Sequence, residues 1–259
     1  MSQINENFKK NGVILIKNLV NKKLIKNLSE NIEGLYGKPI NKSIPKEPII
    51  ICWRHNKNGE KSIFPLSYLN DFRTLMYKTE LLEILKEVTE SKHLQLFETI
   101  VFKKPPKSLD NFYWHNDASF FPLDPPNHVS VWIALDECNK ETGKLEFAKR
   151  SHLEKYNGAP INLKDYESFK KSYFYKKIKN YKIFSPDMIQ GDALFFNGYI
   201  WHSSKPNIAK NKSRKGLCLR FLTQKSSYMY SEGKSASFVK QILKSNKKKL
   251  LNKYFPIFN

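Results

Sequence analysis

Residues 93–103, HLQLFETIVFK, mark the point where the sequence changes from helical to strand-like character. Short runs rich in β-branched and aromatic residues follow, and turn signals such as Pro105-Pro106 and Pro125-Pro126 separate them. These runs are FYWHNDASFF (112–121), HVSVWIAL (128–135), KLEFAK (144–149), DALFFNG (192–198) and GLCLRFL (216–222). Many short strands in succession, mostly without helices between them, predict a double-sheet sandwich or barrel.

Helical patterns precede this strand region. Residues 12–20 predict a short strand and residues 22–36 an amphipathic helix, since Leu24, Ile25, Leu28, Ile32 and Leu35 recur at helical spacing. A second helix is expected over 71–90, with irregular, proline-punctuated chain between. Further along, a Lys- and Tyr-rich insertion at 160–182 is expected to be partly helical, and a basic helix is expected at 236–253.

The composition permits a large core but leaves the partner open. The 259 residues are 40% hydrophobic and 14% aromatic, which favours one large domain over two small ones. The net charge of +21 is compatible with nucleic acid, an anionic membrane surface or acidic metabolites. However, only five of the 45 basic residues are arginines, and the lysines are scattered. This pattern favours solvated surface charge over a dedicated polyanion site, so no specific nucleic-acid partner is expected.

Cysteine usage and hydropathy favour a soluble, cytoplasmic protein. Cys52, Cys138 and Cys218 are odd in number and widely spaced, which does not suit a disulfide framework. The first ten residues, MSQINENFKK, lack the apolar run of a signal peptide, and no stretch approaches about 18 consecutive apolar residues. We therefore expect no membrane association.

His115 and Asp117 are the first candidates for chemistry. On a regular strand these two side chains would point to the same face. An imidazole beside a carboxylate is two thirds of the 2-His-1-carboxylate triad that holds Fe(II) with open positions, and His202, after a later apolar strand, is the candidate third ligand. An HxD pair alone can equally be a structural hydrogen bond.

Arg214 strengthens the metal interpretation. It opens the strand-like run RKGLCLRFL twelve residues after His202. A guanidinium grips a carboxylate in a planar fork that lysine cannot match, so an arginine here suits a dicarboxylate co-substrate. Of the remaining histidines, His152 is expected to be a structural turn residue and His128 to be exposed.

Several motifs together resemble the phytanoyl-CoA dioxygenase-like (PhyH) family of iron- and 2-oxoglutarate-dependent oxygenases. The matching motifs, which run from about residue 8 to 224, are FKKPP (102–106), HND (115–117), FFPL (120–123), VWIALD (131–136), TGKLEF (142–147), Ser151-His152, Gly191-Asp192, WHSS (201–204) and Arg214. The resemblance implies a mainly β, α+β fold with a double-stranded β-helix (jelly-roll, cupin-like) core. One departure is that the family's Pro-Gly-Ser-His turn reads AKRSH at 148–152.

The resemblance also implies roles for individual residues. It makes His115, Asp117 and His202 the iron ligands. It makes Arg214, with Ser204 beside it, the clamp for the distal carboxylate of 2-oxoglutarate. Lys104 and Asn116 are implied as further co-substrate contacts. Because Asp117 is a true carboxylate, the halogenating variants of the chemistry are disfavoured.

The implied domain organisation is a single PhyH-like unit over 1–259. It comprises an N-terminal helical or lid part (1–93), a jelly-roll core (94–225) with an insertion near 155–182, and a basic C-terminal tail (226–259). The implied reaction uses Fe(II), 2-oxoglutarate and O2 to hydroxylate an unactivated C–H bond of a small molecule, releasing succinate and CO2. Two alternatives stay open: a nucleic-acid demethylase of the AlkB type, and a non-catalytic metal-binding jelly-roll protein.

Three residues are candidate substrate contacts: Arg220, Arg54 and Trp132. Arg220 lies six residues after Arg214 and so faces the same side of a regular strand. A buried guanidinium needs an anion, because an unpaired buried charge is costly. Arg220 is therefore expected either to pair with an internal acid, such as Asp192 or Glu146, or to bind an anionic or zwitterionic substrate.

Overall fold

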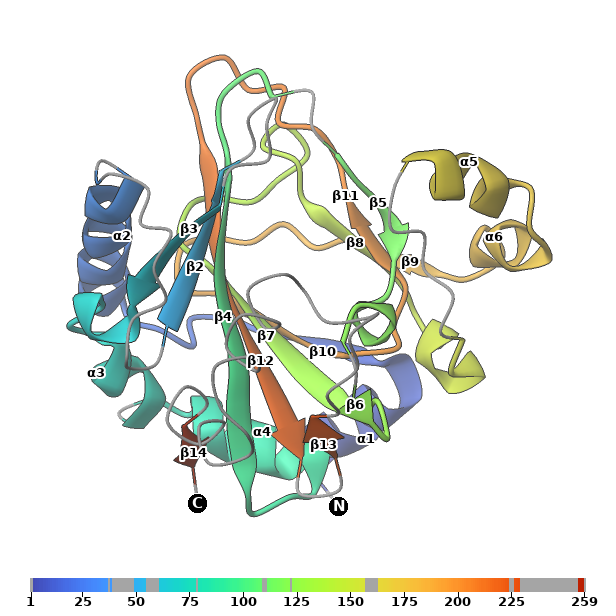
Figure 1. Cartoon of the computed structure of the whole chain (residues 1–259), viewed down its shortest axis with the longest axis horizontal. Coiled ribbons are helices and arrows are strands. Elements are labelled where there is room, and N and C mark those ends of the chain that lie inside the picture. Colours follow the sequence, from blue (N-terminus) through green and yellow to red (C-terminus); the bar gives the residue numbers. More distant parts are fainter. Residues whose placement is uncertain are drawn as a thin grey trace.

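A computed structural model describes residues 2–36, 38, 49–54, 61–77, 79–108, 111–121, 123–156, 163–223, 226–228 and 256–258. Within these residues two β-sheets lie face to face, with helices outside both (Figure 1). This is the expected α+β fold with a jelly-roll core. Among the described residues no helix combines the length and the apolar character needed to cross a membrane.

The larger sheet contains most of the strands. Its order is β1 (Val13–Ile16), β10 (Ala193–Asn197), β7 (His128–Ala134), β12 (Arg214–Thr223), β4 (Leu94–Lys104), β2 (Ile49–Arg54) and β3 (Lys61–Pro65), with β14 (Ile257–Phe258) also paired to β4. Its pairs are antiparallel except for β2 with β4. Strands β12, β4 and β7 lie at its centre, and their side chains reach both faces.

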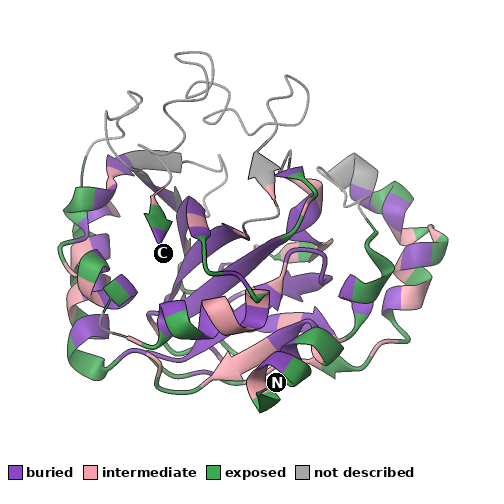
Figure 2. Ribbon diagram, turned by 90° about the horizontal axis from the view of Figure 1, so that it is seen from below, coloured by how far each residue is buried: buried purple, intermediate pink, exposed green. Residues whose placement is uncertain are grey.

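The smaller sheet faces this centre. Its order is β5 (Phe112–His115), β11 (His202–Ser204), β8 (Leu145–Ala148) and β9 (Ile183–Phe184). A separate two-stranded ribbon joins β6 (Leu123–Asp124) to β13 (Ser227–Tyr228). Figure 2 shows that buried residues are concentrated in the strands between the flanking helices.

Helices cover the outer faces of the two sheets. They are α1 (Gln3–Asn11), α2 (Lys22–Tyr36), α3 (Phe72–Tyr77), α4 (Leu81–Thr89), α5 (Leu163–Lys170) and α6 (Tyr173–Ile178), with short 3-10 turns at η1 (Leu66–Tyr68), η2 (Asp117–Ser119) and η3 (Ser151–Glu154). The apolar stripe of α2 and the buried side of α4 pack with the outer residues of the larger sheet in one core. Helices α5 and α6 instead pack around Trp201 beyond the smaller sheet.

Strand alternation explains how β12 serves two environments. Leu217, Leu219 and Phe221 belong to the core shared with the helices, whereas Cys218 belongs to the core between the sheets. Side chains two apart share a face, so Arg214, Gly216, Cys218 and Arg220 form the inner row. That row runs along the interior of the jelly roll, and its two arginines lie six residues apart on β12.

Several element predictions need correction. The helix predicted over 71–90 is two helices, because Thr79 bonds to the Leu75 carbonyl and to the Leu81 amide between them. Helix α1 was not predicted, although Ser2 caps its start. The segment over 37–66, expected to be irregular, contains the strands β2 and β3. Pairing with β4, which lies far along the chain, makes β2 a strand. The helix predicted at 236–253 lies outside the described residues.

Candidate metal centre

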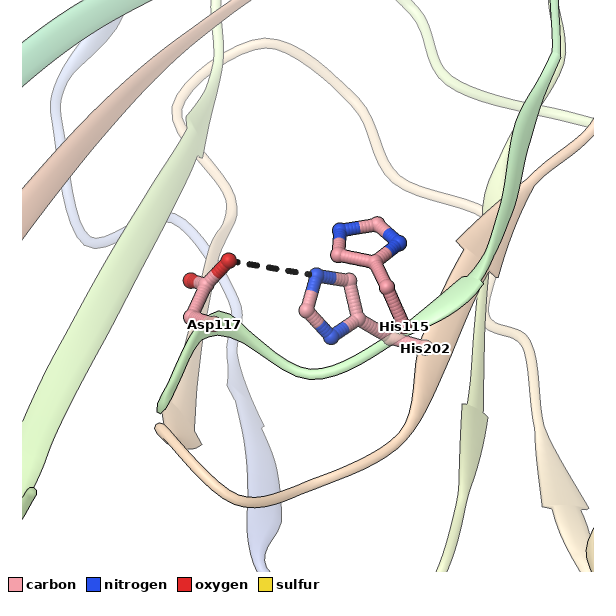
Figure 3. A group of neighbouring side chains, drawn as sticks. All are labelled: His115, Asp117 and His202. Atoms are coloured by element: carbon pink, nitrogen blue, oxygen red, sulfur yellow. Dashed lines mark ion pairs between the residues drawn. The ribbon is translucent and has the colours of Figure 1, made fainter. Parts of the chain in front are cut away.

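The two candidate histidine ligands lie on neighbouring strands of the smaller sheet. His115 ends β5 and His202 begins β11, and the two residues are direct cross-strand partners. Their ring centroids are 4.2 Å apart. In Figure 3 both rings project from adjacent strands toward the same side, where Asp117 also lies.

Backbone hydrogen bonds define which nitrogen each imidazole presents. The Nδ1 atom of His115 lies 2.6 Å from the Tyr113 carbonyl oxygen, and Nδ1 of His202 lies 3.0 Å from the Ile200 carbonyl oxygen. A carbonyl can only accept, so Nδ1 carries the proton in each ring. The Nε2 atom of each histidine is then unprotonated, and its lone pair is available to bind a metal.

Asp117 reaches the centre by a different route from the one predicted. The strand β5 stops at His115, and Asp117 starts the 3-10 turn η2. Asn116 caps this turn, because its side-chain oxygen accepts from the Ser119 amide. The prediction that His115 and Asp117 share a strand face is therefore wrong, and the turn brings the carboxylate round to the two rings.

The three side chains form a compact donor set. One ligand atom from each of His115, Asp117 and His202 lies within 4.8 Å of the others. The closest carboxylate contact joins Oδ1 of Asp117 to Nε2 of His202 at 3.8 Å, drawn as the dashed line in Figure 3. These separations are too long for direct hydrogen bonds and suit atoms that surround a common ion.

The protonation states also suit a cation. Burial, with a smaller effect of the neighbouring His202, lowers the pKa of His115 to about 3, and burial lowers the pKa of His202 as well. Burial alone would raise the pKa of Asp117, but the charge of Arg220, the neighbouring His202 and the hydrogen bonds from Arg220 together outweigh burial and hold the pKa below its usual range. Neutral imidazoles and an ionised carboxylate are the forms that ligate metals.

Arg220 has internal acid partners. Its Nε donates to Oδ2 of Asp117 at 2.9 Å, and its Nη2 donates to Oδ1 at 3.1 Å. Its Nη1 donates to Glu98 on β4. The expectation of an internal pair is met, but the partners named for it, Asp192 and Glu146, are wrong, because those two residues bond to other groups.

A second charged site lies at the other end of the same inner row. Arg214 on β12 and Lys104 on β4 are direct cross-strand partners, and both are almost fully buried. The Lys104 ammonium donates to the Ser204 hydroxyl oxygen at 2.8 Å. Arg214 donates from Nη2 to the Gly143 carbonyl at 2.7 Å. The structure thus places these three predicted co-substrate residues together.

The Arg214 guanidinium retains unused binding capacity. Among the described residues its buried Nε has no hydrogen-bond partner, and no carboxylate there lies in ion-pair contact with the guanidinium. Burial lowers the pKa of Arg214, although a guanidinium stays charged at any physiological pH. A buried cation with an unsatisfied donor is costly unless an anion binds it. The site therefore fits a carboxylate ligand.

Trp132 supports this cation. The Arg214 guanidinium lies 5.2 Å from the centroid of the Trp132 ring, within range of a cation–π contact. Gly216 lets the indole pass over β12, since a Cβ there would come within 2.0 Å of the ring. Trp132 is itself 2% exposed. This buried position gives no support to the predicted role of Trp132 as a substrate contact. The indole packs against the Arg214 guanidinium instead.

The remaining sequence candidates are placed as follows. The Asn116 side chain donates to the Tyr156 carbonyl and accepts from Ser119, so its amide serves the capping turn and is not directed to a co-substrate. Arg54 ends strand β2, but its side chain lies outside the described residues. His128, expected to be exposed, is 2% exposed, because it packs edge-on against Phe97 and Phe121.

Two residues of the centre were not predicted from the sequence. Ser130 on β7 donates to Oδ2 of Asp117 at 2.9 Å, and Glu98 on β4 binds Arg220. Both pair with Arg220 across adjacent strands. Glu98 could have been found from the sequence, because it is a charged residue within the apolar run LQLFETIVF and a buried charge needs a partner. Ser130 lies in the apolar run HVSVWIA, and nothing in the sequence around it indicates a role in the centre.

Two imidazoles and one carboxylate, placed together inside a jelly roll, form the donor set of non-haem iron oxygenases. Fold and cluster together define the class as a jelly-roll protein with a mononuclear metal centre. The family model "Phytanoyl-CoA dioxygenase (PhyH)" matches residues 8–216. The chain belongs to this family of iron- and 2-oxoglutarate-dependent oxygenases and is a dioxygenase of that type.

Curated relatives are distant but cover most of the chain. Peroxisomal phytanoyl-CoA dioxygenase of Bos taurus is 25% identical over 246 residues, which are 88% of this chain and 70% of the relative. A phytanoyl-CoA dioxygenase domain-containing protein 1 homolog of Caenorhabditis elegans is 24% identical over 205 residues, 74% of this chain and 66% of the relative.

Solved structures support the fold. The epimerase SnoN in complex with Fe3+, alpha ketoglutarate and nogalamycin RO aligns with a TM-score of 0.71 at 14% identity, covering 99% of this chain and 98% of that one. EctD from S. alaskensis aligns with a TM-score of 0.70 at 16% identity, covering 92% and 82%. These likenesses extend over the whole jelly roll and both of its sheets.

Proposed function

We propose that His115, Asp117 and His202 bind the catalytic Fe(II) of this dioxygenase. The observation that carries the proposal is the compact cluster of their ligand atoms, within 4.8 Å of one another. Both imidazoles offer Nε2, because their Nδ1 atoms bond to backbone carbonyls. Such second contacts orient a ligand and fix its tautomer before the metal arrives.

Arg214, Lys104 and Ser204 form the proposed site for the distal carboxylate of 2-oxoglutarate. The two cations provide charge, and the orphaned Nε of Arg214 provides a directed donor. Ser204 belongs to β11, the same short strand as His202, so the co-substrate site and the metal site share one element. The proposal is that the co-substrate binds this site through its distal carboxylate and the metal through its other end.

The iron supplies O2 activation and C–H oxidation when it is bound; the protein supplies geometry and a dry surrounding. The His202 ring lies against Phe147 and Phe196, at centroid distances of 5.6 and 5.1 Å. The His115 ring lies edge-on to Phe120 at 5.7 Å. These aromatic contacts restrict the rotation of both rings.

The proposed reaction is hydroxylation of an unactivated C–H bond of a small molecule, with release of succinate and CO2. The PhyH family match supports this type of reaction over AlkB-type demethylation of nucleic acid. The expected preference for an anionic or zwitterionic substrate depended on a free Arg220. Since Asp117 and Glu98 already neutralise Arg220, the proposal assigns no charge to the substrate. A cytoplasmic location stays a prediction.

The test is succinate formation by the purified protein with Fe(II), 2-oxoglutarate and O2, screened against a panel of small molecules. We expect succinate only when iron is present, and a faster rate with a true substrate. Asp117→Ala should abolish the succinate signal and the bound iron. Full succinate production with normal iron content in Asp117→Ala would refute the ligand assignment, and iron binding without any turnover would favour a non-catalytic protein.

A further inference from the structure

Arg220 makes more contacts to the metal-ligand carboxylate than charge balance alone requires. Its Nε and Nη2 grip Oδ2 and Oδ1 of Asp117 side by side, at 2.9 and 3.1 Å. This is the planar fork that an arginine forms with a carboxylate and a lysine cannot. Both side chains are buried, at 7% and 2% exposure. The orientation of the Asp117 carboxylate is therefore set by this fork.

Glu98 in turn holds the guanidinium. It is the cross-strand partner of Arg220 on β4, and Nη1 of Arg220 donates to its carboxylate. The Phe121 ring covers the guanidinium, with its centroid 5.4 Å from Cζ. Contacts from β4 and from the segment after η2 thus fix the arginine on two sides, independently of Asp117.

The two oxygens of Asp117 are not equivalent. Oδ2 accepts from Arg220 Nε and also from the Ser130 hydroxyl, both at 2.9 Å. Oδ1 accepts only from Nη2 of Arg220 among these groups, and it is the oxygen that lies 3.8 Å from Nε2 of His202. Oδ2 is thus occupied by protein donors, and Oδ1 faces the histidines.

We propose that Arg220 is a positioning residue of the metal centre, which turns Asp117 so that Oδ1 alone faces the ion while Oδ2 stays bonded to the protein. A carboxylate held in this way occupies one coordination position, which leaves room for a two-point co-substrate. The inference rests on the proposed function, because it takes Asp117 to be a metal ligand. Two carboxylates and one guanidinium also leave a net negative charge that attracts a cation.

The test measures metal binding without turnover. Mn2+ is titrated calorimetrically, and Co2+ by its visible absorption spectrum, into the metal-free full-length protein and its variants. Arg220→Lys retains the charge but loses the fork, and Arg220→Gln loses both. We expect each to weaken Mn2+ binding about 10- to 100-fold, the usual effect of losing an outer contact to a metal ligand. The Co2+ spectrum should change as Asp117 becomes free to bind through both oxygens.

Two further variants separate positioning from folding. Ser130→Ala removes one neutral donor to Oδ2 and should weaken Mn2+ binding less than either Arg220 variant. Lys215→Gln removes a buried cation of the same strand that bonds to Glu33 on α2, away from the centre. It should lower the melting temperature without changing the Mn2+ affinity. If Arg220→Gln folds poorly, the double variant with Glu98→Gln avoids leaving a buried carboxylate without its cation.

The outcomes distinguish the two proposals. Asp117→Ala is expected to lose Mn2+ binding; unchanged binding in that variant would overturn the metal assignment and the role of Arg220 together. Normal loss in Asp117→Ala, with unchanged or tighter binding and an unchanged Co2+ spectrum in both Arg220 variants, would overturn only the positioning role. Arg220 would then do no more than neutralise Asp117 in the metal-free protein.

Discussion

At the scale of single residues, burial and a few polar partners decide the chemistry of this protein. Asp117 stays ionised because Arg220 offsets the cost of its burial, and each histidine ligand presents Nε2 because a carbonyl takes the other nitrogen. The buried Nε of Arg214 has no hydrogen-bond partner in the described part of the chain. These features follow from individual contacts and can be changed one residue at a time.

The co-substrate clamp is the first residue to test. Arg214→Lys replaces a directed fork by a point charge, and the charge-assisted hydrogen bonds at stake are worth about 1.5–3 kcal/mol. We expect the apparent KM for 2-oxoglutarate to rise about 10- to 150-fold. Mn2+ affinity, measured calorimetrically in the absence of 2-oxoglutarate, should stay the same. An unchanged KM would show that Arg214 is not the main contact for the distal carboxylate, and Lys104 would then be the next candidate.

His128 should make the protein sensitive to acid. Burial lowers its pKa to about 4, and neither ring nitrogen has a hydrogen-bond partner among the residues that the structure describes. The unfolded chain takes up this proton near pH 6.5, so the stabilisation is complete above that pH and is lost as the pH falls toward 4. Between pH 7.5 and pH 5 this residue alone should cost roughly 2 kcal/mol of unfolding free energy.

His128→Leu is the corresponding experiment. The leucine fills the space between Phe97 and Phe121 without a group that can gain a proton. Urea unfolding at pH 7.5 and pH 5 should show a smaller loss of stability on acidification in the variant than in the wild type. Parallel losses in the two proteins would show that His128 does not contribute to the acid sensitivity.

At the scale of elements, β12 organises both sites. Its inner face carries Arg214 at one end and Arg220 at the other, while its outer face packs on the helices. Gly216 lies between them and admits the Trp132 ring, which in turn lies against Arg214. The spacing of the co-substrate and metal sites is therefore a property of one strand and its two neighbours.

A pair of glycine variants tests this arrangement. Gly216→Ala would place a Cβ 2.0 Å from Trp132 Cζ2, so the ring or the strand must shift. We expect a loss of about 1–3 kcal/mol in unfolding free energy together with a higher KM for 2-oxoglutarate. Gly34→Ala on α2 meets nothing within 4 Å and should stabilise the protein by about 0.5–1 kcal/mol with an unchanged KM. Equal behaviour of the two variants would contradict the role of Gly216.

At the scale of the whole molecule, the net charge of +21 could suggest that the protein binds a polyanion such as nucleic acid. The metal centre does not support this interpretation. Several described lysines lie in ion pairs with acids, such as Lys9 with Glu90 and Lys144 with Asp187. The centre itself combines its buried arginine with two carboxylates. Part of the positive charge is thus offset by local ion pairs, both at the surface and in the metal centre.

Oligonucleotide binding should accordingly be weak and non-specific. We expect a single-stranded oligonucleotide to bind at low salt and to dissociate near physiological ionic strength, because binding through phosphate contacts falls steeply with salt. Fluorescence anisotropy over a salt series measures this, and succinate formation should not respond to the oligonucleotide. Tight binding that persists at physiological salt would contradict this expectation and support the nucleic-acid demethylase alternative.

Local patterns in the sequence, together with the resemblance to the PhyH family, were sufficient for the class of this protein. Strand-like runs after residue 93 predicted the double-sheet core, and His115, Asp117, His202 and Arg214 stood out by residue type and spacing. These signals are readable because strand alternation and ligand chemistry act over a few residues. The resemblance to the PhyH family added Lys104 and Ser204; the structure pairs Lys104 with Arg214 across two strands and bonds Lys104 to Ser204.

Only the tertiary structure decided how the centre is held. The contacts of Asp117 with Arg220 and Ser130, and of Arg220 with Glu98, join four separate segments, and they depend on the register of β12 with β4 and β7. Register is set by packing along whole strands on both faces of the sheet, which no local pattern contains. For the same reason the burial of His128 and the pairing of β2 with β4 could not be predicted from the sequence.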